Sequence, residues 1–197
     1  MTTPNLIKIL EDALTKQGSA STDFDLNKDI VLPEGRKLTP AAVLVAFRAD
    51  TGNLILTKRS ARLKHHPGQI AFAGGKQDPT DASPTAAALR EAHEEIGLDP
   101  TQVQVIGALP SHETVTGYAI TPVLAVVHGG FTPIPEAGEV SEVFEVPFNH
   151  VTNPVTFCVQ GRHWNGRERY YYTVPYGPYY IWGATARILR ALAERIT

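Results

Sequence analysis

The stretch Leu89–Leu98, "LREAHEEIGL", decides how this chain is understood. It carries Glu91, Glu94 and Glu95 at positions i, i+3 and i+4, which share one face of a helix. Like-charged pairs at these spacings destabilise a bare helix by roughly a few tenths of a kcal/mol each. The three glutamates are therefore either a solvated acidic face or a set of carboxylates directed at a cation. A divalent cation such as Mg²⁺, which prefers oxygen ligands, turns their repulsion into binding.

The surrounding sequence predicts a helix that packs against a core. Leu89, Ala92 and Ile96 are spaced by three and four residues, which produces an apolar stripe on one side. Ser83 suits the N-cap and Pro84 the first helical position, while a glycine at 97 suits the C-terminal end. We therefore expect the helix to begin at Ser83 and to end at the glycine.

The segment before the helix favours the metal interpretation. In "FAGGK", Phe72–Lys76, two glycines follow a strand-like run, where the backbone can turn sharply and present carbonyl groups to a metal. Lys76 is placed to meet an anion, and Asp81 adds a carboxylate before the helix. Arg90, four residues before Glu94, is placed to hold that carboxylate.

Hydrophobic periodicity predicts a single α/β domain with a mixed sheet, because strand-like and helical segments alternate along the chain. Helices are predicted near each end, at 5–16 and 183–196. Strands are predicted at 41–47, 52–60, 103–109, 120–127, 142–147, 155–159 and 169–174. The first two of these strands are expected to form a hairpin.

Composition excludes several classes of function. Eighteen Lys and Arg against twenty Asp and Glu leave a net charge of −2 in 197 residues, so the protein has no global field for nucleic acid. The single cysteine, Cys158, cannot form an internal disulfide, and its setting "VTFCV" predicts a buried structural residue. No signal peptide or membrane-spanning run is apparent, and the end "ERIT" is not a peroxisomal signal, so we expect a cytoplasmic protein.

Residues 75–98, "GKQDPTDASPTAAALREAHEEIGL", resemble the Nudix box, G-x5-E-x7-R-E-U-x-E-E-x-G-U with U aliphatic. The matching positions are Gly75, Arg90, Glu91, Ala92, Glu94, Glu95, Gly97 and Leu98. Two departures lie in the loop half of the motif. Asp81 stands where the first glutamate is expected, and eight residues rather than seven separate it from Arg90.

This resemblance implies the Nudix fold, an α/β/α sandwich around a mixed β-sheet. Residues 38–197 are expected to form the hydrolase domain and residues 1–37 an N-terminal helical extension. Nudix enzymes hydrolyse a nucleoside diphosphate linked to another moiety, with Mg²⁺ or Mn²⁺ neutralising the diphosphate and activating a water.

The resemblance also implies roles for individual residues. Glu91 and Glu95 are expected to bind the metal, Glu94 to be a third ligand or to act through water, and the Gly75 carbonyl to complete the shell. A carboxylate takes the proton from the attacking water, and Glu94 and Glu139 are the candidates. Glu139, in "GEVSEVFEVP", is alternatively a surface residue beside a strand.

The region before the Nudix box indicates the substrate. Residues 56–76, "LTKRSARLKHHPGQIAFAGGK", resemble the coenzyme A pyrophosphatase signature L-L-T-x-R-[SA]-x3-R-x3-G-x3-F-P-G-G. The matching positions are Thr57, Arg59, Ser60, Gly68, Phe72, Gly74 and Gly75. Lys64 replaces an arginine and Ala73 replaces a proline. The segments at 116–125 and 179–192 also resemble that family's central strand and C-terminal helix.

The implied reaction splits coenzyme A or acyl-coenzyme A into 3′,5′-ADP and 4′-phosphopantetheine or its acylated form. Its extra 3′-phosphate calls for cations, and six of them, counting two histidines, lie within residues 58–66. Arg59 is the first candidate for a phosphate contact, followed by Lys64, while other cations in this stretch are expected to solubilise a loop. The partner is thus a small molecule rather than nucleic acid or membrane.

Two alternatives to this function remain from the sequence. In the first, the substrate is ADP-ribose, a dinucleotide or a nucleoside triphosphate. In the second, the protein is a catalytically silent nucleotide-binding regulator. The complete acidic cluster argues against the second, because a silent domain has no need of it. Aromatic residues gather between 170 and 182, where they suit core packing or a subunit interface better than stacking on adenine. Homodimerisation is left open.

Overall fold

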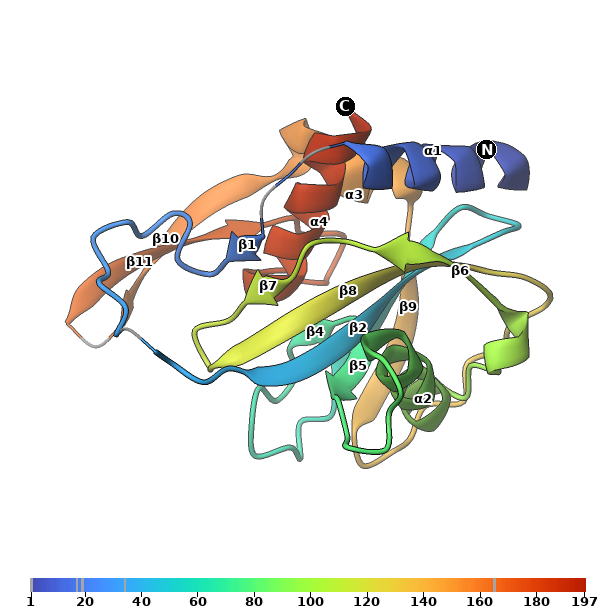
Figure 1. Ribbon diagram of the computed structural model, residues 1–197, viewed down its shortest axis with the longest axis horizontal. Helices are drawn as coiled ribbons and strands as arrows, with labels where there is room; N and C mark the ends of the chain where they lie inside the picture. The colour runs from blue at the N-terminus through green and yellow to red at the C-terminus, as the bar shows by residue number, and fades with distance from the viewer. Residues whose placement is uncertain (1, 17, 19, 34, 165) are drawn as a thin grey trace.

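The protein folds around a mixed β-sheet with helices on both faces (Figure 1). The structure, a computed structural model, describes residues 2–16, 18, 20–33, 35–164 and 166–197. Two ten-residue strands, β2 (Thr39–Arg48) and β8 (Tyr118–Val127), form the centre of the sheet and pair in parallel along their whole length. The predicted α/β/α sandwich around a mixed sheet is confirmed.

The neighbouring strands extend this central pair. β3 (Leu54–Arg59) returns from β2 as an antiparallel hairpin, as predicted, and β5 (Ala73–Lys76) pairs with the other part of β2. The remaining strands of this sheet are β1 (Ser21–Thr22), β4 (Ile70–Ala71), β6 (Val103–Ala108), β7 (His112–Glu113) and β9 (Val140–Val146). Of these, β6 and β7 pair with β8, β4 and β9 pair with β3, and β1 pairs with β7.

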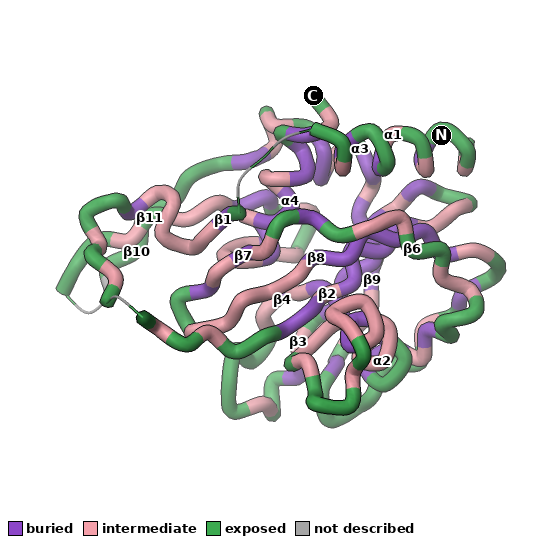
Figure 2. Tube along the Cα trace, viewed as in Figure 1, coloured by how far each residue is buried: buried purple, intermediate pink, exposed green. Residues whose placement is uncertain are grey.

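Helices cover the two faces unequally. Helix α2 lies alone on one face, whereas α1 and α4 cover the other together with the short α3 (Figure 1). Their bounds are α1 Thr3–Thr15, α2 Pro84–Ile96, α3 Phe148–Thr152 and α4 Gly183–Ile196, and two 3-10 turns span Pro100–Gln102 and Pro154–Thr156. Figure 2 shows the buried chain running through the central strands between these layers.

The alternation along β3 shows how the sheet separates its two faces. Leu54 and Leu56 are fully buried against the α1 and α4 layer, and Ile55 is buried against α2. Because successive side chains of a strand point to opposite faces, Arg59 lies on the α2 side and Lys58 on the other. Arg59 is thereby directed toward the glutamates of α2.

A two-stranded arm projects from the α4 side of the molecule (Figure 1). Its strands, β10 (Cys158–Trp164) and β11 (Arg167–Thr173), pair with each other and not with the main sheet. An isolated hairpin is only marginally stable in water. The Asn27 side chain supports it by donating to the Tyr170 carbonyl at 2.8 Å and accepting from the Tyr170 N–H at 2.9 Å.

Most predicted elements are found close to their predicted bounds, including the terminal helices at 3–15 and 183–196. The segment between residues 68 and 84, where we predicted no strand of the sheet, contains β4 and β5, because its backbone pairs with β3 and β2. The prediction of a buried cysteine is wrong: Cys158 is an exposed thiol, since it opens β10 on the projecting arm. Among the described helices, none is long and apolar enough to cross a membrane.

Helix α1 is part of the main core and not a loose appendage. Leu6, Leu10 and Ala13 are buried in the same cluster as Leu189 of α4. We therefore expect Leu10→Ala to lower the free energy of unfolding of the whole domain by about 2–5 kcal/mol, because it leaves a cavity in a shared core.

Urea unfolding followed by circular dichroism measures this loss, with the exposed Glu11→Ala as the matched control. A Leu10→Ala protein as stable as the control would show that the helix does not contribute to the core. The division of the chain between residues 37 and 38 itself stays a prediction.

Candidate active site

Helix α2 is fixed at both ends as the sequence predicts. The Ser83 hydroxyl accepts a hydrogen bond from the Ala86 N–H at 3.1 Å, and Gly97 ends the helix in the left-handed conformation with φ 68°. An αL glycine carries no Cβ penalty at this position, so the helix stops there cleanly. The buried Ala92 and Ile96 hold the helix against the sheet and set the direction of its glutamates.

Glu95 is a carboxylate buried under the glycine strand. Its side chain is 5% exposed, accepts a hydrogen bond from the Gly74 N–H at 3.1 Å, and lies 3.9 Å from the Arg59 guanidinium. Burial raises the pKa of Glu95 to about 7, against the lowering effects of the Gly74 N–H and Arg59, and the nearby Glu91 and Glu139 raise it further. The position thus holds an anion whose charge is incompletely compensated.

Glu91 lies against the second glycine of the turn. A Cβ placed on Gly75 would lie 2.5 Å from the Glu91 carboxyl carbon, so any larger residue would displace that carboxylate. Burial raises the pKa of Glu91, and repulsion from Glu94 and Glu139 adds to this, while Arg90 acts in the opposite direction. The close approach explains why the motif places glycine here.

Arg90 connects the helix to the loop before it. It binds Asp81 through two hydrogen bonds of 3.1 and 2.9 Å, and donates to the Lys76 carbonyl at 3.2 Å. It also reaches Glu91 at 2.9 Å and Glu94 at 3.1 Å. These contacts raise the pKa of Arg90 and lower that of Asp81, in each case chiefly through the hydrogen bonds between them.

The sequence left the part played by Asp81 open, and the structure gives it one. Asp81 is the bidentate partner of Arg90, and it also accepts from the Asp78 N–H at 2.8 Å. Its side chain therefore closes the loop onto the helix and faces the guanidinium. A shorter side chain and one extra residue in the loop are both compatible with this contact.

The predicted site residues differ in how far they are exposed to solvent. Glu94 is 58% exposed and Glu139 is exposed, yet the Glu139 carboxylate is close enough to Glu91 and Glu95 to raise the pKa of both. The Glu139 carbonyl accepts a hydrogen bond from the Ser60 N–H at 2.7 Å. This bond joins the residue before β9 to the loop after β3. The structure thus gathers Arg59, Gly75, Arg90 and the glutamates 91, 94, 95 and 139 around one end of α2.

Two predicted cations lie farther out. Lys64 is exposed on the loop between β3 and β4. Lys76 is exposed at the end of β5, on the opposite side of that strand from Gly75, and its ammonium lies 6.0 Å from the Tyr118 ring centre. The carbonyl of Lys76, rather than its ammonium, contacts the helix through Arg90.

The donor set suits a hard divalent cation. It consists of carboxylate oxygens beside a glycine carbonyl, and two of the carboxylates have raised pKa values because burial and mutual repulsion disfavour their charge. In the part of the chain that the structure describes, no three acidic, histidine or cysteine side chains already converge as a metal cage. Arginines engage them instead, since Arg90 holds Glu91 and Glu94 and Arg59 lies beside Glu95.

Comparisons with known proteins show the family to which this chain belongs. The NUDIX domain family matches residues 37–170. "Uncharacterized Nudix hydrolase NudL" of Enterobacter sp. (strain 638) is 40% identical over 157 residues, covering 79% of this chain and 82% of the relative. The protein of the same name from Escherichia coli (strain K12) is 41% identical with the same coverage.

Solved structures show the same fold. A MutT protein from Methanosarcina mazei Go1 aligns with a TM-score of 0.53 and 18% identity, covering 83% of this chain and 96% of that one. A MutT/nudix family protein from Enterococcus faecalis aligns with a TM-score of 0.50 and 17% identity, covering 86% and 66%.

The fold and the acidic helix define a metal-dependent class of hydrolases acting on phosphoric anhydrides. This chain belongs to the Nudix family and is a Nudix pyrophosphohydrolase. Enzymes of this family generally use divalent cations and act on small-molecule substrates.

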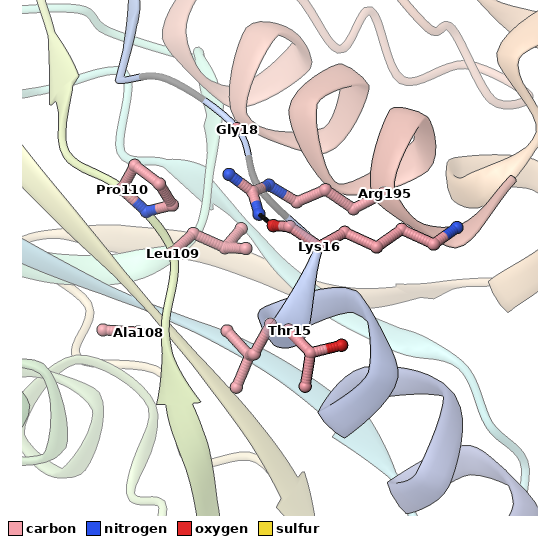
Figure 3. A pocket seen from close by; sticks show the side chains of 8 residues that line it. Thr15, Lys16, Gly18, Ala108, Leu109, Pro110 and Arg195 are labelled. Atoms are coloured by element: carbon pink, nitrogen blue, oxygen red, sulfur yellow. Dashed lines mark hydrogen bonds between the residues drawn. The ribbon is translucent and has the colours of Figure 1, made fainter.

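A separate hollow lies away from this centre. It has a volume of about 860 Å³ between the end of α1 and Pro110, where Arg195 donates to the Lys16 carbonyl at 2.5 Å (Figure 3). Its wall includes Gly18, between residues that the structure does not describe. Because the described residues of its lining include no acidic side chain and none from α2, we assign the chemistry to the glutamate cluster.

A methyl group at Gly75 should displace the Glu91 carboxylate. We expect Gly75→Ala to reduce turnover by about 10- to 100-fold, since displacing a catalytic group by an ångström has effects of this size. Its stability should change little, because the contacted atoms are the end of a side chain. Gly130→Ala is the matched control, since nothing lies within 4 Å of its added carbon.

Steady-state kinetics with a nucleoside diphosphate substrate, together with thermal unfolding, measure both effects. Equal activity in the two alanine variants would contradict the close packing of Gly75 on Glu91.

The buried carboxylate makes the stability of the metal-free protein depend on pH. In the folded protein the pKa of Glu95 is raised to about 7, from an ordinary value of 4.5. Between these values the folded state holds more protons than the unfolded chain, so the free energy of unfolding falls as pH rises. Glu95→Gln lacks this contribution.

Urea unfolding in the presence of a chelator, from pH 4 to 8 in both proteins, isolates the effect. The stability of the wild type relative to Glu95→Gln should decline across about pH 4.5 to 7. Parallel profiles would show that Glu95 is not buried as described.

Proposed function

We propose that this Nudix pyrophosphohydrolase cleaves the diphosphate of coenzyme A or acyl-coenzyme A, releasing 3′,5′-ADP and 4′-phosphopantetheine or its acylated form. One observation carries the proposal. Arg59, the arginine of the signature that resembles coenzyme A pyrophosphatases, lies 3.9 Å from Glu95 of the Nudix helix. The arginine of the upstream signature and a glutamate of the Nudix helix thus lie side by side at one site.

The proposed metal ligands are Glu91 and Glu95, assisted by Glu94 and the Gly75 carbonyl. A bound Mg²⁺ or Mn²⁺ supplies charge neutralisation and lowers the pKa of a water. Arg59 is placed to bind a diphosphate oxygen, because its guanidinium is only partly buried beside the cluster. Arg90 positions the helix by holding Asp81, and so acts on the chemistry through other residues.

Of the two candidates for the general base, the structure favours Glu139. An oxygen of Glu94 is engaged by Arg90 at 3.1 Å, which limits its capacity to accept a proton. Glu139 interacts electrostatically with both Glu91 and Glu95, while its backbone fixes the loop at Ser60. The proposed general base, Glu139, therefore lies just before β9, whereas the proposed metal-binding glutamates lie on α2.

Phosphorus NMR of the products formed from coenzyme A in ¹⁸O-labelled water tests the reaction. We expect 3′,5′-ADP and 4′-phosphopantetheine, with the label in one of them, and the labelled product identifies the phosphorus that is attacked. Glu95→Gln should lose turnover by about 10³-fold or more, on the scale of losing a principal electrostatic group, while keeping its fold.

A parallel assay with ADP-ribose and dinucleotides distinguishes the second candidate. If the enzyme prefers these compounds to coenzyme A, the proposed substrate is wrong, but the assignment as a pyrophosphohydrolase stands. Full activity of Glu95→Gln would instead overturn the assignment of the metal site.

A further inference from the structure

The loop between β8 and β9 is attached to the last turn of α2. Phe131 in this loop is buried in the same cluster as Ile96 of the helix. Further along, the Ile134 N–H donates to the Ile96 carbonyl at 2.9 Å. The Glu136 N–H donates to the Glu95 carbonyl, also at 2.9 Å. The last carbonyls of a helix have no partner within it, so the loop satisfies two of them, and one belongs to the buried Glu95.

The Glu136 side chain turns back onto its own loop. Its Oε2 accepts a hydrogen bond from the Glu139 N–H at 2.8 Å. The Glu136 carbonyl accepts from the same N–H at 3.0 Å and from the Val140 N–H at 2.8 Å. A Cβ placed on Gly138 would lie 2.9 Å from Oε2 of Glu136, so the glycine leaves room for the carboxylate. Glu136 therefore closes the turn immediately before β9 with both its backbone and its side chain.

These bonds complete a ring of contacts at the catalytic centre. From Glu95 the ring passes through the Glu136 backbone to Glu139, and the Glu139 carbonyl accepts from the Ser60 N–H at 2.7 Å. Ser60 follows Arg59 in the chain, and the Arg59 guanidinium lies 3.9 Å from the Glu95 carboxylate. Direct contacts thus connect Glu139 to the acidic helix on one side and to the proposed phosphate-binding arginine on the other.

A β-bulge lies where this ring meets the sheet. Opposite Lys58 and Arg59 the register shifts by one residue, and Ser141 of β9 is the extra residue. The Ser141 hydroxyl donates to the Lys58 carbonyl at 3.0 Å. Bulges are over-represented next to active sites, where they re-aim side chains. The residues just before β9 are therefore oriented by the turn that precedes the strand, and not by regular alternation along it.

Glu139 is an exposed residue on that turn. An exposed glutamate has many accessible rotamers, and confining it costs conformational entropy. A general base nevertheless has to lie within hydrogen-bond reach of the proton that it accepts. A backbone fixed at the turn reduces the cost, because it sets the position and direction from which the Glu139 side chain starts.

We propose that Glu136 is a positioning residue that holds Glu139 in place as the general base, accepting the Glu139 N–H with its side chain while its own N–H is bound to the end of α2. The proposal rests on the proposed function, because it takes Glu139 as the base. In this role Glu136 acts through Glu139 and touches neither substrate nor metal. It needs an acceptor atom and not a negative charge.

Substitutions that separate the acceptor from the charge test this role. Glu136→Ala removes the acceptor, so kcat should fall about tenfold while KM changes less than about twofold, because a base acts in the transition state. Glu136→Gln keeps a side-chain oxygen for the Glu139 N–H and should recover most of the activity. Equal losses in the two variants would show that the charge of Glu136 takes part in the chemistry. That result, or full activity of Glu136→Ala, would overturn the proposal.

Gly138→Ala reaches the same contact from the backbone side. Its methyl group would occupy the space of the Glu136 carboxylate, so its kinetics should match those of Glu136→Ala. Gly130→Ala, in the same loop, is the matched control, since nothing lies within 4 Å of its added carbon.

Mn²⁺ binding followed by electron paramagnetic resonance, together with thermal unfolding, should be unchanged in all these variants, because the glutamates of α2 are retained. Weaker Mn²⁺ binding by Glu136→Ala would assign Glu136 to the metal and contradict a positioning role. Activity of Gly138→Ala equal to that of Gly130→Ala would contradict it as well.

A double-mutant cycle shows whether Glu136 acts through Glu139. Glu139→Gln should lower kcat by about 10²-fold or more, the usual contribution of a general base. Adding Glu136→Ala to Glu139→Gln should then lower kcat by less than about twofold, because the group that Glu136 positions is already lost. Losses that multiply in the double variant would refute the proposal.

The cycle also separates this proposal from the proposed substrate, because it needs only a diphosphate that the enzyme hydrolyses. Coupled losses with ADP-ribose, without cleavage of coenzyme A, would refute the substrate and support the role of Glu136. Cleavage of coenzyme A with independent losses would do the reverse. Full activity of Glu139→Gln would refute both the base and its positioning residue, and leave the reaction intact.

Discussion

The contact between Arg90 and Asp81 is the constraint on which the catalytic end of the molecule depends. It joins the loop after β5 to α2 through a two-pronged interaction, whose geometry a lysine cannot reproduce. The same guanidinium holds the Lys76 carbonyl and the outer oxygens of Glu91 and Glu94. The glycine strand and the acidic helix therefore keep one relative position, which fixes Glu91 beside Gly75.

This arrangement confines a carboxyl group to a place where burial disfavours its charge. Glu95 has little exposure, and the Gly74 N–H and Arg59 offset only part of the cost of burying its charge. A hard cation completes the compensation. The raised pKa of Glu95 and the affinity for a divalent ion thus have the same physical origin, namely carboxylates crowded into a space with too few positive partners.

Much of the fold was accessible from local sequence rules. Ser83, Pro84 and the glycine after Ile96 specified α2 almost to the residue, since caps and turn glycines act locally. The strands β4 and β5 were missed because their pairing depends on partners distant in the chain. Cys158 was misjudged because an apolar pattern does not reveal that its hairpin projects from the sheet. Likewise, no spacing rule brings Asn27 beside Tyr170, because that contact depends on how the arm folds back on the N-terminal segment.

The hold of Asn27 on the arm has a further consequence. This nearly buried side chain imitates a strand partner for Tyr170, and it belongs to the segment that precedes the family-matched region. The orientation of the arm is thereby governed by residues that take no part in the chemistry. Substitutions in this N-terminal segment therefore act on the position of the arm and leave the glutamates of α2 where they are.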